Sequence, residues 1–172
     1  DNVTIDGDNP NTGGTNRNLT ITNASATTVN LSPTIRVAVA ASVITSADNN
    51  SVLNCNVNGN GTARNASGLT STTNTENSSF GIYVGGLAST VSATTAPSAL
   101  TSVSTNTAPS GSTVNNFTVT NCAVNACARA IFYNGAAATV CPGTLTVSNN
   151  LVGDQVTSLA GAPPYTSPAT TV

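Results

Sequence analysis

Five short segments of this chain alternate apolar and polar residues in the same way. Each places β-branched or apolar residues at every second position, which is the period of a strand with one buried face. The segments are VTIDG from Val3, LTITN from Leu19, SVLN ending at Asn54, FTVTN from Phe117 and LTVSN from Leu145. They align without gaps, and the alignment predicts one core position, occupied by Ile5, Ile21, Val52, Val119 and Val147.

A second fixed position lies two residues after the core position. It holds Gly7 in the first segment and asparagine in the others, namely Asn23, Asn54, Asn121 and Asn149. Asparagine tolerates the left-handed backbone conformation needed at a corner, and its amide can bond the same amide in a neighbouring strand. We therefore predict a structural asparagine ladder at these four residues.

Segments of a second kind alternate with the first: TIRVAVA from Thr34, FGIYVGG from Phe80 and RAIFYNG from Arg129. Regular alternation of two strand types is expected when a chain coils and returns to the same faces. We predict an all-β fold, a right-handed single-stranded parallel β-helix (solenoid) of about four to five coils. A β-sandwich also has many short alternating strands, but it does not favour asparagine at one fixed offset.

The spacing of the core positions predicts the domain organisation. Val52 and Val119 are 67 residues apart, which fits one coil only if 59–79 and 87–113 leave it as two long loop insertions. Such loops are usually functional or mobile, so they are candidates for a contact surface. We expect the β-helix domain to span 1–154, followed at 155–172 by a Pro-, Thr- and Ser-rich linker or edge segment.

Composition narrows the range of partners. The 172 residues include 30 Thr and 24 Asn, but six acids, four Arg and no Lys or His, for a net charge of −2. Binding to nucleic acid or to an anionic membrane surface needs clustered cations, so neither is expected. No apolar stretch approaches the roughly 20 residues that span a bilayer, so membrane insertion is not expected either.

The sequence offers little for catalysis. A Ser or Cys nucleophile has no His or Lys to activate it, and of the six acids only Asp1, Asp6 and Asp8 cluster. We expect no enzyme activity and no cofactor. Asp6 and Asp8, in DGDNPNTGG, are weak calcium candidates, because carboxylates are hard ligands but the spacing is not that of an EF-hand loop. An ordinary turn is the favoured interpretation.

The cysteines and the aromatic residues leave alternatives open. The four cysteines are disulfide candidates in an extracellular composition, with Cys127 and Cys141 as the preferred pair and Cys55 and Cys122 as the others. Cys55 also fits a small buried side chain. Alternation predicts that Tyr83, with Phe132 or Tyr133, forms an exposed strip suited to carbohydrate stacking or a subunit contact, although packing in the core is favoured.

Several runs resemble a known group of proteins. IDGDNPNTGGTNRNLTITN, IRVAVAAS, NCNVNGNG, FGIYVGG and TNCAVNACARAIFYNG are similar to the right-handed β-helix segments of large surface proteins from gliding, type IX-secreting bacteria. The resemblance implies an extracellular structural or adhesive module, either a segment of a large surface adhesin or the subunit of a surface filament. The partners would be other copies of the chain, flanking domains, or cell-surface glycans.

Three alternatives remain from other functional classes. One is a carbohydrate-binding module, and another is a polysaccharide-active enzyme of the pectate lyase-like type, which shares the β-helix architecture. The third is an ice-binding solenoid, suggested by the outward Thr-x-Thr pairs at Thr20 and Thr118. That array is interrupted, because Asp6, Leu53 and Ser148 occupy matching positions.

Overall fold

The fold consists almost entirely of β-strands. The computed structural model describes residues 2–24, 31–40, 46–59, 78–88, 113–127, 129–134 and 144–153. Among these residues the one helical element is the 3-10 turn η1 (Pro10–Thr12), so none of them forms a helix that could cross a bilayer. The strands are β1 (Thr4–Asp6), β2 (Leu19–Thr22), β3 (Leu31–Ala40), β4 (Ser51–Leu53), β5 (Cys55–Asn58), β6 (Ser78–Ala88), β7 (Phe117–Thr120), β8 (Ala123–Asn125), β9 (Arg129–Asn134), β10 (Leu145–Ser148) and β11 (Leu151–Val152).

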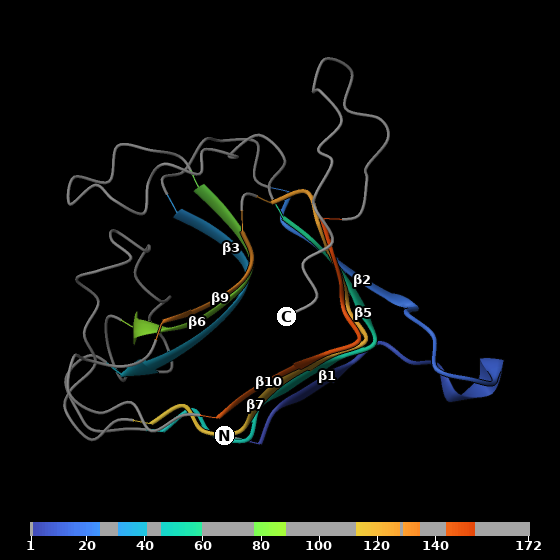
Figure 1. The fold of residues 1–172 in the computed structure, drawn as a ribbon, viewed down its shortest axis with the longest axis horizontal. Helices are drawn as coiled ribbons and strands as arrows, with labels where there is room; N and C mark the ends of the chain where they lie inside the picture. The colour runs from blue at the N-terminus through green and yellow to red at the C-terminus, as the bar shows by residue number, and fades with distance from the viewer. Residues whose placement is uncertain are drawn as a thin grey trace, which may run out of the picture.

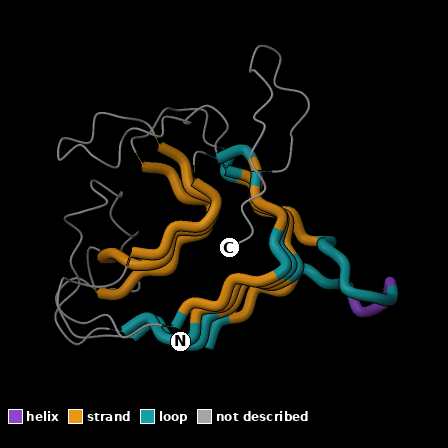
Figure 2. The backbone as a smooth tube through the Cα atoms, viewed as in Figure 1, coloured by secondary structure: helices purple, strands orange, loops and turns teal. Residues whose placement is uncertain are grey.

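The strands form three parallel sheets, and each sheet joins strands that are far apart in the chain (Figure 1). Sheet A has the order β1-β4-β7-β10, sheet B the order β2-β5-β8-β11, and sheet C the order β3-β6-β9. The chain therefore enters sheets A, B and C in turn, and Figure 2 shows the strands of each sheet lying over one another. The predicted all-β class and the parallel pairing are confirmed.

Sheet A contains four of the five segments of the first kind. Ile5 pairs with Val52, Val52 with Val119, and Val119 with Val147, so these predicted core residues form one column across the sheet. Val52 and Val119 are buried, Ile5 is half-buried and Val147 is exposed. The difference follows from position, because β1 and β10 are the edge strands of sheet A.

The segment LTITN is the exception, because it forms β2 in sheet B. There Ile21 pairs with Val57, and Val57 with Val124. The predicted equivalence of Ile21 with the sheet A column is therefore wrong. Alternation shows that one face of a strand is buried, but it does not show which sheet the strand joins.

Sheet C contains the segments of the second kind, and its alternation is interrupted at one level. Ala130 and Ile131 both pack against the main core, Phe132 lies in a separate cluster, and Tyr133 packs against the main core again. Gly81, one strand away at the level of Ala130, faces sheet B so closely that a Cβ would lie 2.2 Å from Cγ1 of Val124. The strands of sheet C are bent, with the convex side of the curve toward sheets A and B (Figure 1).

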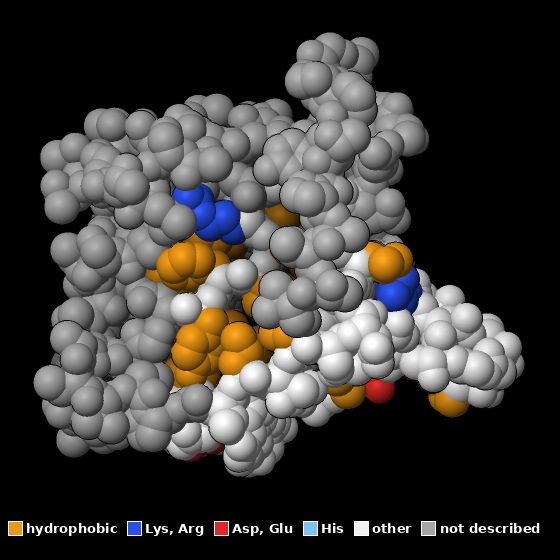
Figure 3. Space-filling view, viewed as in Figure 1, with side chains coloured by type: hydrophobic (Ala, Val, Ile, Leu, Met, Phe, Trp, Pro, Cys, Tyr) orange, Lys and Arg blue, Asp and Glu red, His pale blue; other side chains and the backbone are white. Residues whose placement is uncertain are grey.

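The main core lies between the three sheets and takes residues from all of them. Its fully or nearly fully buried members include Val52, Val57, Ile82, Val84, Val114, Phe117, Val119 and Val124. Figure 3 shows hydrophobic side chains at the centre of the viewed face, between the sheets of Figure 1. The predicted insertions, except for residues at their ends, and the segment 155–172 lie outside the described residues.

Candidate functional site

The corner after sheet A is built from stacked asparagines. Asn54, Asn121 and Asn149 follow β4, β7 and β10, and all three have left-handed backbones, with φ of 55°, 52° and 54°. The Asn121 amide Nδ2 donates to Oδ1 of Asn54 at 2.9 Å. Gly7 occupies the same corner after β1, where a Cβ would lie 2.1 Å from the Asn54 carbonyl oxygen. The corner therefore joins adjacent strands of sheet A through both backbone and side chains.

Asn23 does not belong to this corner. It follows β2, so it lies at the end of sheet B, where its backbone N–H donates to the Asn58 carbonyl at 3.0 Å. Its amide donates to the Ser32 hydroxyl at 2.6 Å, at the entry to sheet C. The predicted four-residue ladder is thus corrected to three residues, because LTITN imitates FTVTN in pattern while it lies in a different sheet.

A second row of asparagines, not predicted from the sequence, lies before sheet A. Asn2, Asn49 and Asn116 have φ of 60°, 58° and 55°. The Asn116 amide donates to Oδ1 of Asn49 at 2.8 Å, and the Thr144 hydroxyl donates to Oδ1 of Asn116 at 2.7 Å. The signal was present in the sequence, because each asparagine lies three residues before Ile5, Val52 or Val119.

Arg17 connects the first of these corners to more distant strands. It lies in the segment between β1 and β2, which extends away from the sheets and contains η1 (Figure 2). Its Nε donates to the Asn121 carbonyl at 2.7 Å and its Nη2 to Oδ1 of Asn121 at 3.0 Å, while its own carbonyl accepts from the Asn56 amide at 2.8 Å. Arg17 therefore links the region of β1 to that of β7, two strands away in sheet A.

The calcium candidates Asp6 and Asp8 are engaged in turn contacts. Oδ1 of Asp6 accepts from the Asp8 backbone N–H and the Asn54 amide, and Oδ1 of Asp8 accepts from the Asn16 backbone N–H. The bonds from Asn54 and Asp8 lower the pKa of Asp6 below its usual value. In the part of the chain that the structure describes, His, Cys, Asp and Glu form no group of three able to hold a metal.

Asp48 plays a comparable part before sheet A. Its carboxylate accepts from the Asn115 backbone N–H at 2.6 Å and from the Thr113 hydroxyl at 2.9 Å. These bonds, the first above all, lower the pKa of Asp48. The carboxylate thus ties the segment before β4 to the segment before β7 and uses its acceptor oxygens within the fold.

Cys55 and Cys122 are buried thiols on neighbouring strands, and neither forms a disulfide. Their positions are opposite each other, because Asn56 pairs with Ala123. The Cys55 thiol lies 3.0 Å from the Leu53 carbonyl, and the Cys122 thiol lies 3.4 Å from the Val52 carbonyl. Burial, with the Cys122 thiol next, raises the pKa of Cys55 to about 11, and burial also raises the pKa of Cys122.

The structure therefore corrects the disulfide assignment for Cys55 and Cys122. Both match the alternative of a small side chain buried in the core, since their strand positions point inward among apolar residues. Cys141, the expected partner of Cys127, lies outside the described residues.

The predicted aromatic strip is not exposed. Tyr83 is 0% exposed and packs in a cluster on the outer face of sheet C, where its ring stacks on Phe132 and meets the edge of Phe80. Tyr133 lies on the other face, and its hydroxyl donates to the Val114 carbonyl at 3.0 Å. Tyr83 pairs with Phe132, one residue before Tyr133, so Tyr83 and Tyr133 lie on opposite faces of sheet C and do not form a common binding surface.

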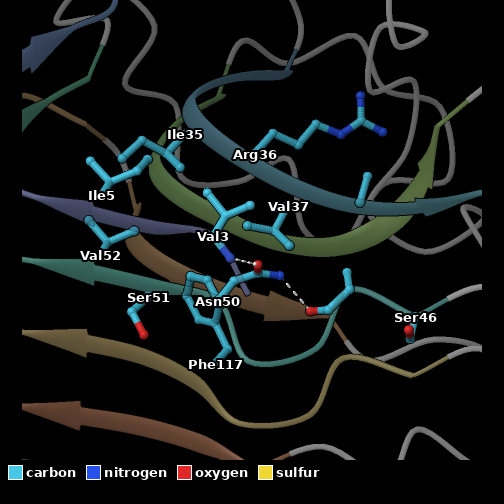
Figure 4. A pocket seen from close by; sticks show the side chains of 12 residues that line it. Val3, Ile5, Ile35, Arg36, Val37, Ser46, Asn50, Ser51, Val52 and Phe117 are labelled. Atoms are coloured by element: carbon cyan, nitrogen blue, oxygen red, sulfur yellow. Dashed lines mark hydrogen bonds between the residues drawn. The ribbon is translucent and has the colours of Figure 1, made fainter. Parts of the chain in front are cut away.

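A cavity of about 310 Å³ lies beside the first strands of sheets A and C (Figure 4). Its apolar lining includes Val3, Ile5, Ile35, Val37, Val52 and Phe117. Asn50 is fixed at its side: Oδ1 accepts from the Val3 backbone N–H at 2.9 Å, and Nδ2 donates to the Ala47 carbonyl at 2.7 Å. Arg36, Ser46 and Ser51 also line the cavity, so its wall is apolar with a few polar residues, and the Asn50 amide is already used by the backbone.

Comparisons with known proteins leave the chain without an assigned family. No family model, no curated protein and no solved structure matches it.

Proposed function

We propose that the chain is a right-handed single-stranded parallel β-helix that acts as an extracellular structural or adhesive module. It would serve as a segment of a large surface adhesin or as the subunit of a surface filament. The repeated passage through sheets A, B and C supports the winding, and parallel strands joined by crossovers are right-handed in nearly all proteins. In this proposal the coils are β1-β2-β3, β4-β5-β6, β7-β8-β9 and the partial coil β10-β11.

The connections between sheets support the proposed coil boundaries. The strands leave residues 59–77 between β5 and β6 and residues 89–116 between β6 and β7, which corrects the expected insertions, because residues 78, 79, 87 and 88 belong to β6. The large distance between Val52 and Val119 then belongs to one coil, because these residues are neighbours in sheet A. The segment 155–172 follows the last described strand and would be the linker.

The observation that carries the proposal is the use of polar side chains between adjacent strands. Asn121 bonds Asn54, Asn116 bonds Asn49, and Asp48 bonds the backbone of Asn115. Side chains that join one strand of a sheet to the next cannot also bind a substrate without breaking contacts that hold the fold together. Such a distribution supports a scaffold role over catalysis, and the proposed module performs no reaction.

The extracellular location is proposed from composition and resemblance. The chain has many Thr and Asn, few charges and sequence runs similar to those of exported surface proteins. Antibodies raised against the purified chain should label intact, unpermeabilised cells of the source. Labelling only after permeabilisation would contradict the location.

The structural role has a separate test. Removing the codons for residues 1–153 in frame should reduce adhesion or filament formation while the surrounding protein is still exported. The matched control replaces Thr15 with Ala, which changes an exposed side chain between β1 and β2 and leaves the stacked corners and the outer face of sheet A intact. Unchanged adhesion and filaments after the deletion would overturn the proposal, and product formation from a polysaccharide panel would favour the enzyme class.

One observation favours glycan binding as a second candidate. Thr4, Ser51, Thr118 and Thr146 pair in register and form a column of hydroxyls on the outer face of sheet A, with neighbours about 4.8 Å apart. Such a column offers repeated hydrogen-bond donors and acceptors to a polysaccharide. Saturable retention on a glycan array that is lost in Thr118→Ala/Thr146→Ala would support it.

The ice-binding alternative uses the same face. The adjacent outward column contains Asp6, Leu53, Thr120 and Ser148, so the hydroxyl array is one column wide. Thermal hysteresis of the purified chain, reduced in the same double variant, would distinguish ice binding from glycan binding.

A further inference from the structure

We propose that the two ends of sheets A and B bind a second copy of this chain head to tail. In this contact β10 and β11 of one copy pair in parallel with β1 and β2 of the next. The inference rests on the proposed function, since it names the partner of the structural module. Sheet C, with three described strands, is not part of the proposed contact.

Apolar residues on the first and last strands of sheets A and B lack the covering strand that their inner neighbours have. In sheet A, Val119 is 0% exposed beneath β10, whereas Val147 of β10 is 40% exposed. In sheet B, Val124 is 0% exposed and its neighbour Val152 is 51% exposed. At the opposite end Val3 is 56% exposed beside the apolar cavity. Inside the molecule, the cover for such residues is another strand of the same pattern.

The hydrogen-bonding edges fit the same arrangement. Ser51 N–H donates to the Val3 carbonyl and Gly7 N–H to the Leu53 carbonyl, so alternate residues Thr4 and Asp6 direct their backbone groups away from β4. At the other end, the carbonyls of Thr144 and Ser148 accept from the backbone N–H groups of Phe117 and Asn121, on the side of β7. Leu145 and Val147 therefore direct their backbone groups to the open edge of sheet A.

These edges match in one register. Placing Ile5 of one copy opposite Val147 of the other continues the apolar column and also sets Thr4 opposite Thr146. The free N–H and C=O groups then alternate as they do between β7 and β10 within one copy. Both the side chains and the backbone thus select the same parallel pairing.

The polar groups at the two ends are complementary. In this register Asp6 lies opposite Ser148, and Asn149 follows directly. Within one copy Asp6 already accepts from the Asn54 amide, which follows its partner Leu53 in the same way. The hydroxyl of Ser148 and the amide of Asn149 are neutral donors suited to a carboxylate, so one end supplies an acceptor and the other supplies donors.

Features that normally prevent such pairing are missing from the described edges. Proteins protect edge strands with lysine, proline, bulges or inward charges. The strands β10, β11 and β2 contain no charged residue and no proline, and β1 contains one charge, Asp6. Charge repulsion therefore does not oppose the approach of a second copy.

Sedimentation velocity over a range of concentrations tests the contact on the purified 172-residue chain. The wild type should associate into chains, with a repeat of about 19 Å in electron micrographs, which is four strand spacings. Val3→Lys and Val147→Lys should each raise the dissociation constant at least about tenfold, because the ammonium would be buried without a partner. Thr118→Lys, which adds the same charge to the outer face of a central strand, should associate as the wild type does.

Mixing the two end variants gives a sharper result. Val3→Lys retains a normal β10 end and Val147→Lys retains a normal β1 end, so an equimolar mixture should form pairs and no longer chains. Circular dichroism and the melting temperature of each variant establish that it is folded. Equal association of both variants and the wild type would overturn the proposal, as would a folded wild type that stays monomeric at every concentration.

A cysteine pair tests the register. Thr4→Cys and Thr146→Cys lie about 14 Å apart within one copy, three strand spacings, but opposite each other between copies. Under dioxygen with a copper catalyst, two thiols lose two protons and two electrons to oxygen and join as a disulfide, which should give a ladder on a non-reducing gel. Thr4→Cys/Thr118→Cys should give only the background of the wild type.

The result also separates this inference from the proposed function. A folded monomer that still supports adhesion in cells would refute head-to-tail binding and leave the structural module intact. If the purified wild type does not associate and antibodies do not label intact cells, both head-to-tail binding and the extracellular structural module would be refuted.

Discussion

Strands β7 and β10 have almost the same sequence but different surroundings. FTVT and LTVS place apolar residues at the same two positions and are followed by asparagine. Phe117 and Val119 of β7 are 0% exposed, while Leu145 and Val147 of β10 are 39% and 40% exposed. The strand β7 has neighbours on both sides and β10 has a described neighbour on one. The local pattern sets the direction of a side chain, and the place in the sheet sets its burial.

The same contrast applies to the corner residues. Asn121, after β7, donates to Asn54 and accepts from Arg17, whereas Asn149, after β10, is exposed. The two residues share a left-handed backbone, with φ of 52° and 54°. Variants at these matched positions can therefore separate two contributions to the free energy of unfolding, the left-handed backbone strain and the hydrogen bonds of the stacked amide.

Matched truncations in the apolar column should show the largest difference. Phe117→Ala is expected to lower the free energy of unfolding by about 3–5 kcal/mol, because it removes a fully buried ring and leaves a cavity. Leu145→Ala, at the paired position of β10, should cost less than about 1.5 kcal/mol, since water already reaches this side chain. Urea unfolding at concentrations low enough to keep the chain monomeric measures the free energy of unfolding of both variants. Equal decreases for the two variants would contradict the comparison.

The corner asparagines should show a smaller difference. Asn121→Ala is expected to cost about 1–3 kcal/mol, because it leaves the bonded groups of Asn54 and Arg17 without their amide partner and forces alanine into a left-handed backbone. Asn149→Ala should cost about 1 kcal/mol, mainly from backbone strain.

Glycine provides the control for this pair. Asn121→Gly relieves the strain but still removes the amide, so the difference between the glycine and alanine variants measures the strain alone. If Asn121→Gly is as stable as the wild type in urea, the stacked amide contributes nothing and the interpretation of this corner fails.

Much of the fold was predictable because the repeats place apolar residues at fixed positions, and these positions indicate which side chains are buried. The column of Ile5, Val52, Val119 and Val147 and the pairing of the second strand type both follow from residues at fixed offsets. The corner of Asn54, Asn121 and Asn149 was predictable for the same reason, since few residues adopt a left-handed backbone at low cost. The row of Asn2, Asn49 and Asn116 has an equally regular offset and was missed.

Other features depend on distances that local sequence does not contain. LTITN has the alternation and the final asparagine of a sheet A strand, yet it lies in sheet B, and Asn23 and Ile21 were misplaced with it. The contact of Arg17 with Asn121 joins residues 104 positions apart. Burial of Tyr83, the favoured interpretation, is confirmed, but alternation gives only the face of its side chain and not the separate cluster that covers that face.

Acid should weaken the contacts made by Asp48 more than those made by Asp6. Hydrogen bonds lower the pKa of both carboxyls, so the folded state binds a proton less readily than the unfolded chain, whose reference value is 3.8. The stabilisation is present above that value and is lost as the pH falls through the lower folded pKa. Asp48 is half-buried and bonded to two residues near β7, whereas Asp6 is exposed on the edge strand.

Melting temperatures between pH 2 and pH 6 test this difference. Asp48→Asn should flatten the decline toward acid, and Asp6→Asn should flatten it less. A larger effect of Asp6→Asn would mean that the edge contact, and not the inner one, dominates the acid response.

The smallest effect is expected at the position that follows the corner asparagines. Inner strands place the thiols of Cys55 and Cys122 there, and the last strands place Asn150, which is half-buried. Burial raises the pKa of Cys55 from the ordinary thiol value of 9.0 to about 11, so the folded state favours the neutral thiol. Its contribution to stability is complete below pH 9 and declines as the pH rises through about 11.

Alkylation resolves this last comparison because iodoacetamide reacts with the thiolate and not the thiol. At pH 8, mass spectrometry should find Cys55 and Cys122 largely unmodified in the folded chain and modified after unfolding in urea. The variant Asn150→Cys, with a thiol at the equivalent end position, should react faster than Cys55 while the chain stays folded. If Cys55 reacts as fast as this end thiol, the inner position is not protected by its neighbouring strands, and the burial difference between β7 and β10 does not extend to sheet B.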